Sequence, residues 1–160
     1  MRASGRRERF LRGGDDAASG DTLASAAGLT KGAYVLAEAP SGTPEVILIA
    51  TGSEVQLAVA AREALADEGI QARVVSAPSL EWFEVQDAAY RESVLPASVT
   101  ARVSVEAGIS LTWRPYVGDR GRSVSIEHFG ASADYKTLFR EFGITTNAVV
   151  AAAKETLASA

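Results

Sequence analysis

Residues 46–76 read VILIATGSEVQLAVAAREALADEGIQARVVS, and this stretch decides the fold of the chain. It opens with a continuous apolar run at 46–50, which predicts a strand buried on both faces of a sheet. A helix is expected at 54–68, because apolar side chains recur at helical spacing and a glycine follows. A second strand is expected at 72–76. Together these elements form a βαβ unit, so the two strands should be parallel and joined by a right-handed crossover.

The turn between the first strand and the helix contains Gly52 and Ser53. We expect Ser53 to cap the helix N-terminus, since serine is among the favoured capping residues. Backbone amides and the helix dipole also make such a turn attractive to anions. The glycine patterns of dinucleotide-binding turns and of P-loops are both missing here. Two interpretations therefore stay open: a capped structural turn, or a small-anion site at Gly52 and Ser53.

The rest of the chain repeats the alternation of strands and helices less regularly. A short strand at 32–37 precedes the βαβ unit. The later elements are expected to be one or two helices at 81–93, a strand at 100–105, a short helix at 109–116, a strand at 121–127, a loop at 128–133, a helix at 134–142 and a final helix capped by Thr145 or Thr146. This order predicts an α/β domain with a parallel sheet.

Composition bounds the class of protein. The 160 residues fit one domain, and 47% hydrophobic with 22% charged residues is ordinary for a globular protein. No apolar run approaches the roughly 20 residues that span a bilayer, so no membrane partner is expected. There is no cysteine, which excludes a disulfide, a thiol nucleophile and a cysteine–zinc site.

The charge is unevenly distributed along the chain. Residues 1–12 carry five arginines and one glutamate, whereas the whole chain has a net charge of −4. The basic start lacks the apolar stretch of a secretory signal, and an acidic body is a poor match for a phosphate backbone. We therefore expect residues 1–27 to be a flexible tail or divergent leader, and we expect no nucleic-acid partner.

Few residues are suited to catalysis. His128 is the single histidine, and no G-x-S-x-G string presents a serine to it, which argues against a hydrolase triad. One histidine with scattered carboxylates is also too little for a metal site. His128 is open to two interpretations, a packing or capping residue or a functional one.

Charged and aromatic side chains give further candidates. Glu106 and Glu127 should end neighbouring strands, where they could act as an acid–base pair or serve the structure alone. Tryptophans 82 and 113 are expected in the core or at an interface. Three arginines around one loop could bind a phosphate or face solvent: Arg114, Arg120 and Arg122.

Longer strings resemble the C-terminal domain of transketolase. They run in register from about residue 28 to the C-terminus, and they are GLTKGAYVL (28–36), ATGSEV (50–55), LEWFEVQDAAYRESVLP (80–96), TARVSVEAGI (100–109), WRPYVG (113–118), HFGASAD (128–134) and FREFGIT (139–145). The string HFGASADYK is similar to actinobacterial versions of this domain. Several long strings in the right order make the resemblance specific.

The resemblance implies a three-layer α/β/α fold over residues 28–160, with a mostly parallel five-stranded sheet and one antiparallel strand. Transketolases transfer a two-carbon ketol unit between sugar phosphates in the pentose phosphate pathway, using thiamine diphosphate and a divalent metal (Mg or Ca). In that family the cofactor lies between two other domains at a dimer interface. The resemblance therefore implies no catalytic, cofactor-binding or metal-binding residue in this sequence. The remaining anion or interface candidates are Gly52, Ser53, Glu106 and His128.

Two functions follow as hypotheses. The first is a transketolase C-terminal domain, as a fragment or a split subunit, which is cytoplasmic, serves assembly and is inactive alone. Its partners would be the missing thiamine-diphosphate-binding domains, on the same or a separate chain, or a second copy in a homodimer. This hypothesis predicts an exposed apolar docking patch. The alternative is a freestanding small-anion-binding or regulatory module.

Overall fold

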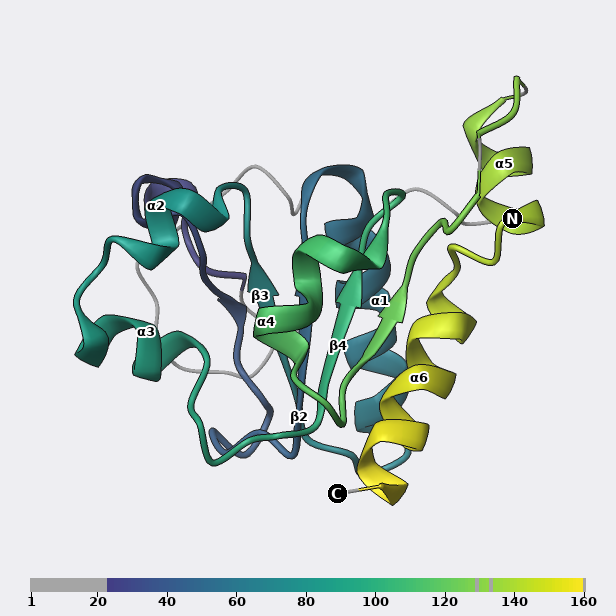
Figure 1. The fold of residues 1–160 in the computed structure, drawn as a ribbon. Helices are drawn as coiled ribbons and strands as arrows, with labels where there is room; N and C mark the ends of the chain where they lie inside the picture. Colours follow the sequence, from purple (N-terminus) through teal and green to yellow (C-terminus); the bar gives the residue numbers. More distant parts are fainter. Residues whose placement is uncertain (1–22, 129, 133, 160) are drawn as a thin grey trace.

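In the computed structural model, a five-stranded sheet lies between two layers of helices (Figure 1). The structure describes residues 23–128, 130–132 and 134–159. Of Lys136 it describes the backbone only. The strand order is β1-β3-β2-β4-β5, with β1 antiparallel to β3 and every other neighbouring pair parallel. The predicted three-layer, mostly parallel sheet with one antiparallel strand is thereby confirmed. The strands are β1 (Tyr34–Ala37), β2 (Val46–Ala50), β3 (Ala72–Ser76), β4 (Arg102–Val105) and β5 (Arg122–Val124).

The helices cover the two faces of the sheet unequally. The 3-10 turns are η2 (Ala26–Lys31), η3 (Gly52–Glu54) and η4 (Ser110–Trp113). The α-helices are α1 (Val55–Asp67), α2 (Leu80–Glu84), α3 (Ala88–Val94), α4 (Arg114–Val117), α5 (Tyr135–Glu141) and α6 (Thr146–Ala158). The long helices α1 and α6 pack on one face, together with α5, and α2, α3, η4 and α4 pack on the other (Figure 1).

Strand β2 is the centre of the core. Its five residues are at most 1% exposed, and their side chains alternate between the two faces. Val46, Leu48 and Ala50 pack on the side of α1 and α6. Ile47 and Ile49 pack on the other side, with the buried side chains of α2, α3, η4 and α4. The predicted parallel pairing of the two strands joined by α1 is confirmed.

Several predicted boundaries shift for identifiable reasons. The predicted helix at 109–116 divides into η4 and α4 because Pro115, near the start of α4, has no amide to donate to an earlier turn. Strand β5 is shorter than the strand predicted at 121–127. Its last residue, Val124, pairs with Val105, where β4 ends, so β4 has no residue left to pair with the chain after Val124. The final helix is capped by Thr145, whose side chain accepts a hydrogen bond from the amide of Ala148.

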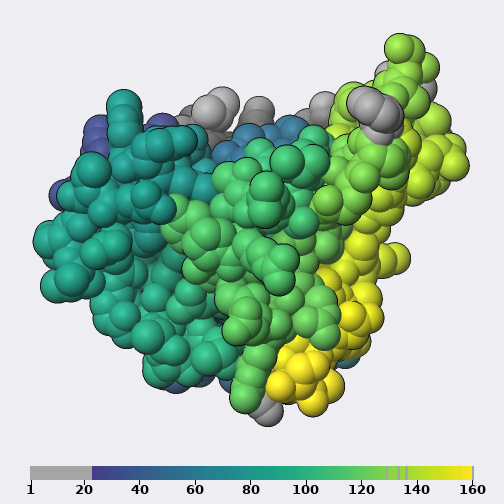
Figure 2. All heavy atoms as spheres, viewed as in Figure 1, coloured from purple at the N-terminus to yellow at the C-terminus, as the bar shows by residue number. Residues whose placement is uncertain are grey.

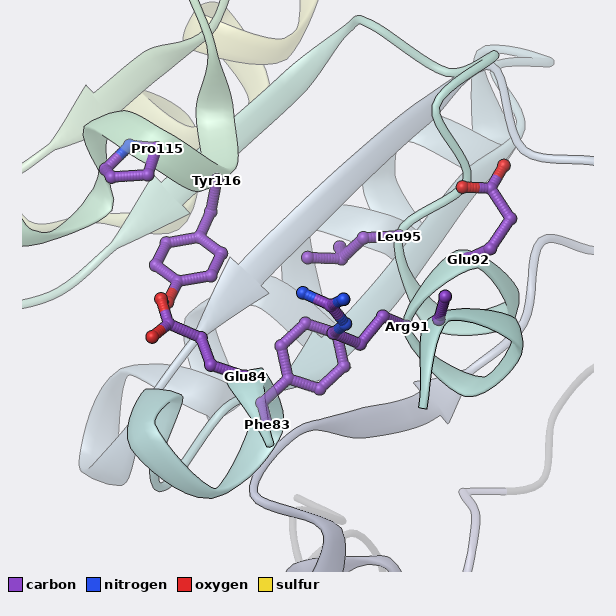
Figure 3. A pocket seen from close by; sticks show the side chains of 8 residues that line it. Phe83, Glu84, Arg91, Glu92, Leu95, Pro115 and Tyr116 are labelled. Carbon is purple, nitrogen blue, oxygen red and sulfur yellow. The ribbon is translucent and has the colours of Figure 1, made fainter. Parts of the chain in front are cut away.

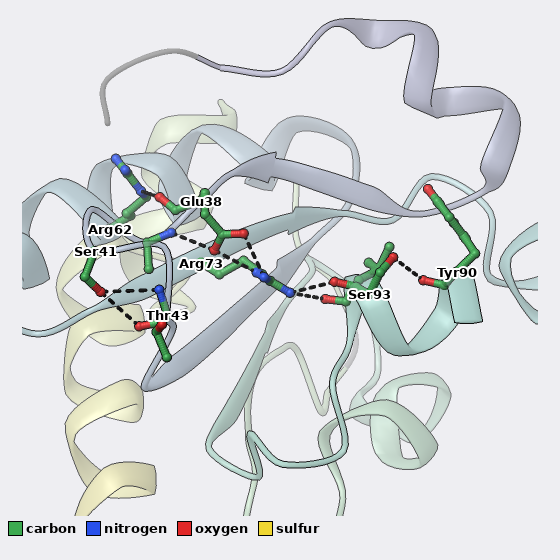
Figure 4. Close-up of polar contacts among 9 residues, drawn as sticks. Glu38, Ser41, Thr43, Arg62, Arg73, Tyr90 and Ser93 are labelled. Carbon is green, nitrogen blue, oxygen red and sulfur yellow. Dashed lines mark hydrogen bonds and ion pairs between the residues drawn. The ribbon is translucent and has the colours of Figure 1, made fainter. Parts of the chain in front are cut away.

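Two arginines close the C-terminal end of α3. The last carbonyls of a helix have no partner within the helix. Arg73 of β3 donates to the carbonyls of Ser93 and Val94 and forms a two-pronged ion pair with Glu38 (Figure 4). Arg102 of β4 donates to four more carbonyls, those of Leu95, Pro96, Val99 and Tyr116. The sheet thus holds this helix through two guanidinium groups, each of which donates four hydrogen bonds.

The segment before β1 is tied to α2. Turn η2 was not predicted from the sequence, and Gly32 ends it with φ +82°. The Gly32 carbonyl accepts a hydrogen bond from the amide of Ser79 at 2.9 Å. A Cβ on Gly32 would come within 2.3 Å of the Ser79 carbonyl oxygen, so only glycine fits this approach. The chain therefore reaches the sheet alongside α2.

The two tryptophans should differ sharply in their effect on stability. Trp113 is 2% exposed and its indole N–H donates to Glu106, whereas Trp82 is 59% exposed. We expect Trp113→Ala to lower the free energy of unfolding by about 3–5 kcal/mol. The control Trp82→Ala should change it by less than about 0.5 kcal/mol. Urea titration followed by circular dichroism measures both, and equal effects would contradict the placement of Trp113 in the core.

Candidate functional site

The four candidate residues lie beyond the carboxyl ends of parallel strands. Gly52 and Ser53 follow β2, Glu106 follows β4, and His128 lies four residues beyond β5. In open α/β sheets this edge is where ligands usually bind. The structure therefore places the candidates at one edge of the sheet. The contacts of each side chain there show whether it is suited to bind a ligand or serves the structure.

The predicted capping role of Ser53 is wrong. Gly52 has φ +56°, and the chain then makes the 3-10 turn η3, which runs directly into α1. Ser53 lies inside that turn, so the capping position of α1 falls to Glu54, whose side chain makes no capping hydrogen bond. Ser53 is exposed, and its carbonyl accepts a hydrogen bond from the Gln56 side chain.

Glu54 is a residue of this edge that the sequence reasoning missed. It is only 6% exposed and stands at the N-terminus of α1, where a carboxylate interacts favourably with the helix dipole. Its Oε2 atom lies 3.6 Å from the position that a Cβ on Gly52 would occupy. A negative charge already fills this place, so the turn is a poor site for a second anion. The sequence did contain a signal for this role of Glu54, because it is an acidic residue in the first turn of the helix predicted at 54–68.

Glu106 and Glu127 both hold turn η4. The Glu106 carboxylate accepts the indole N–H of Trp113 at 2.7 Å, at the last residue of the turn. The Glu127 carboxylate accepts the amide of Ser110 at 2.9 Å, at its first residue. Hydrogen bonds from Ser110, and then from Ser125, lower the pKa of Glu127 from its ordinary 4.5. Each carboxylate is thus engaged with its own donors, which favours the structural interpretation over an acid–base pair.

His128 packs against an aromatic ring at the surface. Its imidazole lies edge-on to Phe142, with ring centroids 4.7 Å apart and an interplanar angle of 76°. The residue is exposed and joins the end of the β5 segment to the chain that follows α5. This contact supports the packing interpretation of His128.

The three arginines of the predicted phosphate cluster do not form one cradle. Arg122 donates to the carbonyls of Arg120 and Gly121 and approaches Glu155 of α6 at 3.7 Å. Arg114 and Arg120 are exposed. Within residues 23–128, 130–132 and 134–159, no group of three histidine, aspartate or glutamate side chains is placed to hold a metal ion. None of the helices described is long and apolar enough to cross a membrane.

A cleft of about 620 Å³ lies between α2, α3 and α4 (Figure 3). Figure 2 shows the teal surface of α2 and α3 meeting the green surface of α4 along it. Tyr116 of α4 donates a hydrogen bond across the cleft to Glu84 of α2. Burial, and then this hydrogen bond, raise the pKa of Tyr116 well above its ordinary 10.0. The bond therefore joins two helices through residues that are 32 apart in the sequence.

Large apolar side chains are exposed at α2 and at η4. Trp82 of α2 and Val85, which follows it, are 59% and 81% exposed, and Ile109 before η4 and Leu111 within it are 56% and 68% exposed. Isolated exposed apolar residues are ordinary, but pairs on neighbouring elements indicate a contact surface. The exposed apolar side chains at α2 and η4 thus correspond to the apolar docking patch that the sequence predicted.

Comparison with known proteins places these features in a family. A family model described as "Transketolase-like TK C-terminal domain" matches residues 32–145. The chain belongs to this transketolase C-terminal domain family. The match spans β1 to β5 and α5, and it ends at the residue that caps α6.

Transketolases from several organisms are similar to this chain. That of Mycobacterium tuberculosis is 60% identical over 136 residues, which are 82% of this chain and 19% of the relative. Transketolase 1 of Escherichia coli is 59% identical over 131 residues, covering 82% and 20%. The chain therefore spans about a fifth of the length of these relatives.

Solved structures agree with this placement. Transketolase from Leishmania mexicana superposes with a TM-score of 0.77 at 40% identity, over 85% of this chain and 19% of that one. A split gene transketolase, solved as an inactive beta4 tetramer, superposes with a TM-score of 0.62 at 22% identity, over 81% and 43%. The latter likeness shows the shared fold alone.

The turn after β2 yields a test within this transketolase-like domain. Gly52→Val puts a branched side chain at φ +56°, beside the Glu54 carboxylate. We expect it to lower the free energy of unfolding by about 1 kcal/mol or more. Ser53→Ala in the same turn should change it by less than about 0.5 kcal/mol, because Ser53 does not cap α1. A larger loss for Ser53→Ala than for Gly52→Val, measured by urea titration, would refute this description.

Glu127 predicts a pH dependence of stability. Its pKa is lower in the folded chain than the ordinary 4.5, so its contribution is present above that value and is lost as the pH falls through the folded pKa. The stability advantage of the wild type over Glu127→Gln should be constant at neutral pH and should shrink below pH 4.5. Thermal melts at a series of pH values check this, and an advantage that does not vary with pH would count against it.

Proposed function

We propose that this chain is the C-terminal domain of a transketolase and serves the assembly of that enzyme rather than its chemistry. The supporting observation is the continuous match over residues 32–145 to the family model, on a sheet that superposes with a transketolase domain. The whole enzyme would transfer ketol units between sugar phosphates in the pentose phosphate pathway, in the cytoplasm. The domain would extend over residues 28–160, with residues 1–27 as a tail or leader.

The residues present do not fit thiamine diphosphate or its divalent metal. The carboxyl edge carries Glu54, Glu106 and Glu127, which repel a diphosphate. No group of carboxylate and histidine side chains in the described part of the chain is arranged for a metal. We derive no catalytic step from these residues. In this proposal, thiamine diphosphate and Mg or Ca belong to the rest of the enzyme.

The partner of this domain follows from the same reasoning. The relatives are about five times longer, so the remaining four fifths of a transketolase is the natural partner, on the same chain or on a separate one. The split gene transketolase with a similar fold supports the version of this proposal in which the partner is a separate chain. A homodimer of the complete enzyme is part of the proposal. The alternative of a freestanding anion-binding module is weakened, since Glu54 stands where the anion would bind.

A chimera tests the proposed function. The matching 136-residue segment of the Mycobacterium tuberculosis transketolase is replaced by its counterpart from this chain. We expect ketol transfer within about tenfold of the parent enzyme, because the reacting groups are all outside the exchanged segment. The isolated chain should show no ketol transfer. A coupled spectrophotometric assay with xylulose 5-phosphate and ribose 5-phosphate measures both.

The control is the same chimera carrying Gly52→Val, which perturbs the exchanged domain alone. It should keep the KM for both sugar phosphates and unfold at a lower temperature. A folded wild-type chimera without ketol transfer, or an isolated chain that transfers ketol units, would refute the proposed function.

A further inference from the structure

Glu54 is a buried carboxylate for which its own domain supplies no hydrogen-bond donor. The residue is 6% exposed. Its side chain makes no capping hydrogen bond, and among the residues that the structure describes no other hydrogen bond or ion pair engages it. A carboxylate that is largely kept from water without hydrogen bonds is costly, and the N-terminus of α1 offsets only part of this cost. The arrangement around Glu54 is therefore completed by a donor from another body.

The Glu54 carboxylate can be reached from the carboxyl edge of the sheet. Its Oε2 atom lies 3.6 Å from the position that a Cβ on Gly52 would occupy, so the side chain folds back over the turn after β2. In the described part of the chain, Thr156 Oγ1 is the one side-chain nitrogen or oxygen that is both fully enclosed and without a partner. The Glu54 oxygens also lack a partner, so they still reach the surface. A group from another protein can contact them without displacing the core.

The other two glutamates of this edge have donors within the domain. Glu106 accepts the indole N–H of Trp113, and Glu127 accepts the amide of Ser110. Both donors belong to turn η4. Glu54 differs from them in that the described structure leaves both of its oxygens available to a partner.

The carboxyl edge is acidic throughout. The segments that leave β2, β4 and β5 there are residues 51–54, 106–113 and 125–128, and they contain three glutamates and no lysine or arginine. They lie along one side of the molecule, at the top in Figure 1. Such a surface attracts a positively charged partner and repels a negatively charged one. The charge of this edge therefore favours a basic partner.

Exposed apolar side chains lie on the segment next to Glu54. The last residues of β2 and β4 pair with each other, so the turn that carries Glu54 and the segment that carries Ile109 and Leu111 leave the sheet side by side. Ile109 and Leu111 are 56% and 68% exposed. The amide of Ile126 donates to the carbonyl of Gly108 at 2.8 Å, which fixes the course of this segment. A surface that is ordered before binding loses less entropy when a partner docks.

An arginine is the cation that suits Glu54 best. A metal ion does not fit, because no group of three histidine, aspartate or glutamate side chains in the described residues is placed to hold one. The planar guanidinium donates two parallel hydrogen bonds to one carboxylate, which would engage both Glu54 oxygens. Arginine is also enriched at protein interfaces, where it commonly lies beside apolar contacts.

We propose that the carboxyl edge around Glu54 is the docking surface for the rest of a transketolase, which supplies an arginine to this carboxylate and apolar side chains to Ile109 and Leu111. This inference rests on the proposed function, and it assigns the surface and the charge of the partner through which that function is exerted. The ion pair at Glu54 forms only in the assembled enzyme.

Hydrogen–deuterium exchange of the isolated chain and of the active chimera tests the assignment. Peptides covering residues 51–57 and 106–112 should exchange at least about fivefold more slowly in the chimera than in the isolated chain. Glu54→Gln keeps the size of the side chain and removes its charge, and it should abolish most of this protection. Glu63→Gln, at an exposed position of α1, is the matched control and should leave the protection intact.

The folded state of the variants is checked on the isolated chain. Glu54→Gln should melt within about 2 °C of the wild type there, because the removal of an unpaired charge offsets the lost interaction with the helix dipole. Leu111→Asn is a second variant, at a position that is 68% exposed, and it keeps the test intact if Glu54→Gln does not fold. In the chimera it should also raise exchange at residues 106–112.

Three outcomes would overturn the proposal. An active chimera without new protection at 51–57 and 106–112, or with protection that survives Glu54→Gln, would overturn the assignment and leave the proposed function standing. A folded chimera without activity would overturn both. A dimer of the isolated chain, seen in sedimentation and abolished by Glu54→Gln, would assign this edge to a second copy instead.

Discussion

The burial of β2 on both faces is the constraint on which the rest of this structure depends. Five consecutive apolar residues are at most 1% exposed, so each face of the sheet has to be covered by its own helices. Burying each large aliphatic side chain contributes about 1.5–3 kcal/mol, which is available only if both layers are in place. Helices α1 and α6 provide one layer. The other layer consists of short pieces, which lack the length to be stable alone.

Those short pieces are held by polar groups of the sheet and its loops. Arg73 and Arg102 close the end of α3, while Glu106 and Glu127 hold the two ends of η4. Tyr116 and Glu84 then join α4 to α2. The second layer is therefore positioned by charged hydrogen bonds more than by helix length. This arrangement leaves the helices slightly apart and creates the cleft between them.

The sequence was sufficient for the features that depend on local pattern. The βαβ unit, the parallel pair and a threonine cap on the final helix all follow from spacing and residue type, although the choice of Thr145 over Thr146 came from the structure. It failed at Ser53, because serine before a helix does not reveal that a 3-10 turn intervenes.

The arrangement around the candidate site depended on long-range contacts. The strand-end rule placed Glu106 and Glu127 at the ends of neighbouring strands, but it could not show what each side chain binds there. The pairing of Glu106 with Trp113 joins different elements and depends on how these pack. The same holds for the cleft, whose walls come from residues 83–95 and 115–116.

Gly32 has a consequence for motion. The backbone there lies so close to Ser79 and Phe83 that η2 cannot slide over α2 without breaking the contact. The first turn of the domain is thus part of its rigid body. Bending at Gly32 is excluded by its neighbours, and the chain before η2 is held as well, because the amide of Ala24 donates to the Leu36 carbonyl at 2.7 Å. Residues 24–37 therefore move with the sheet and α2 as one rigid unit.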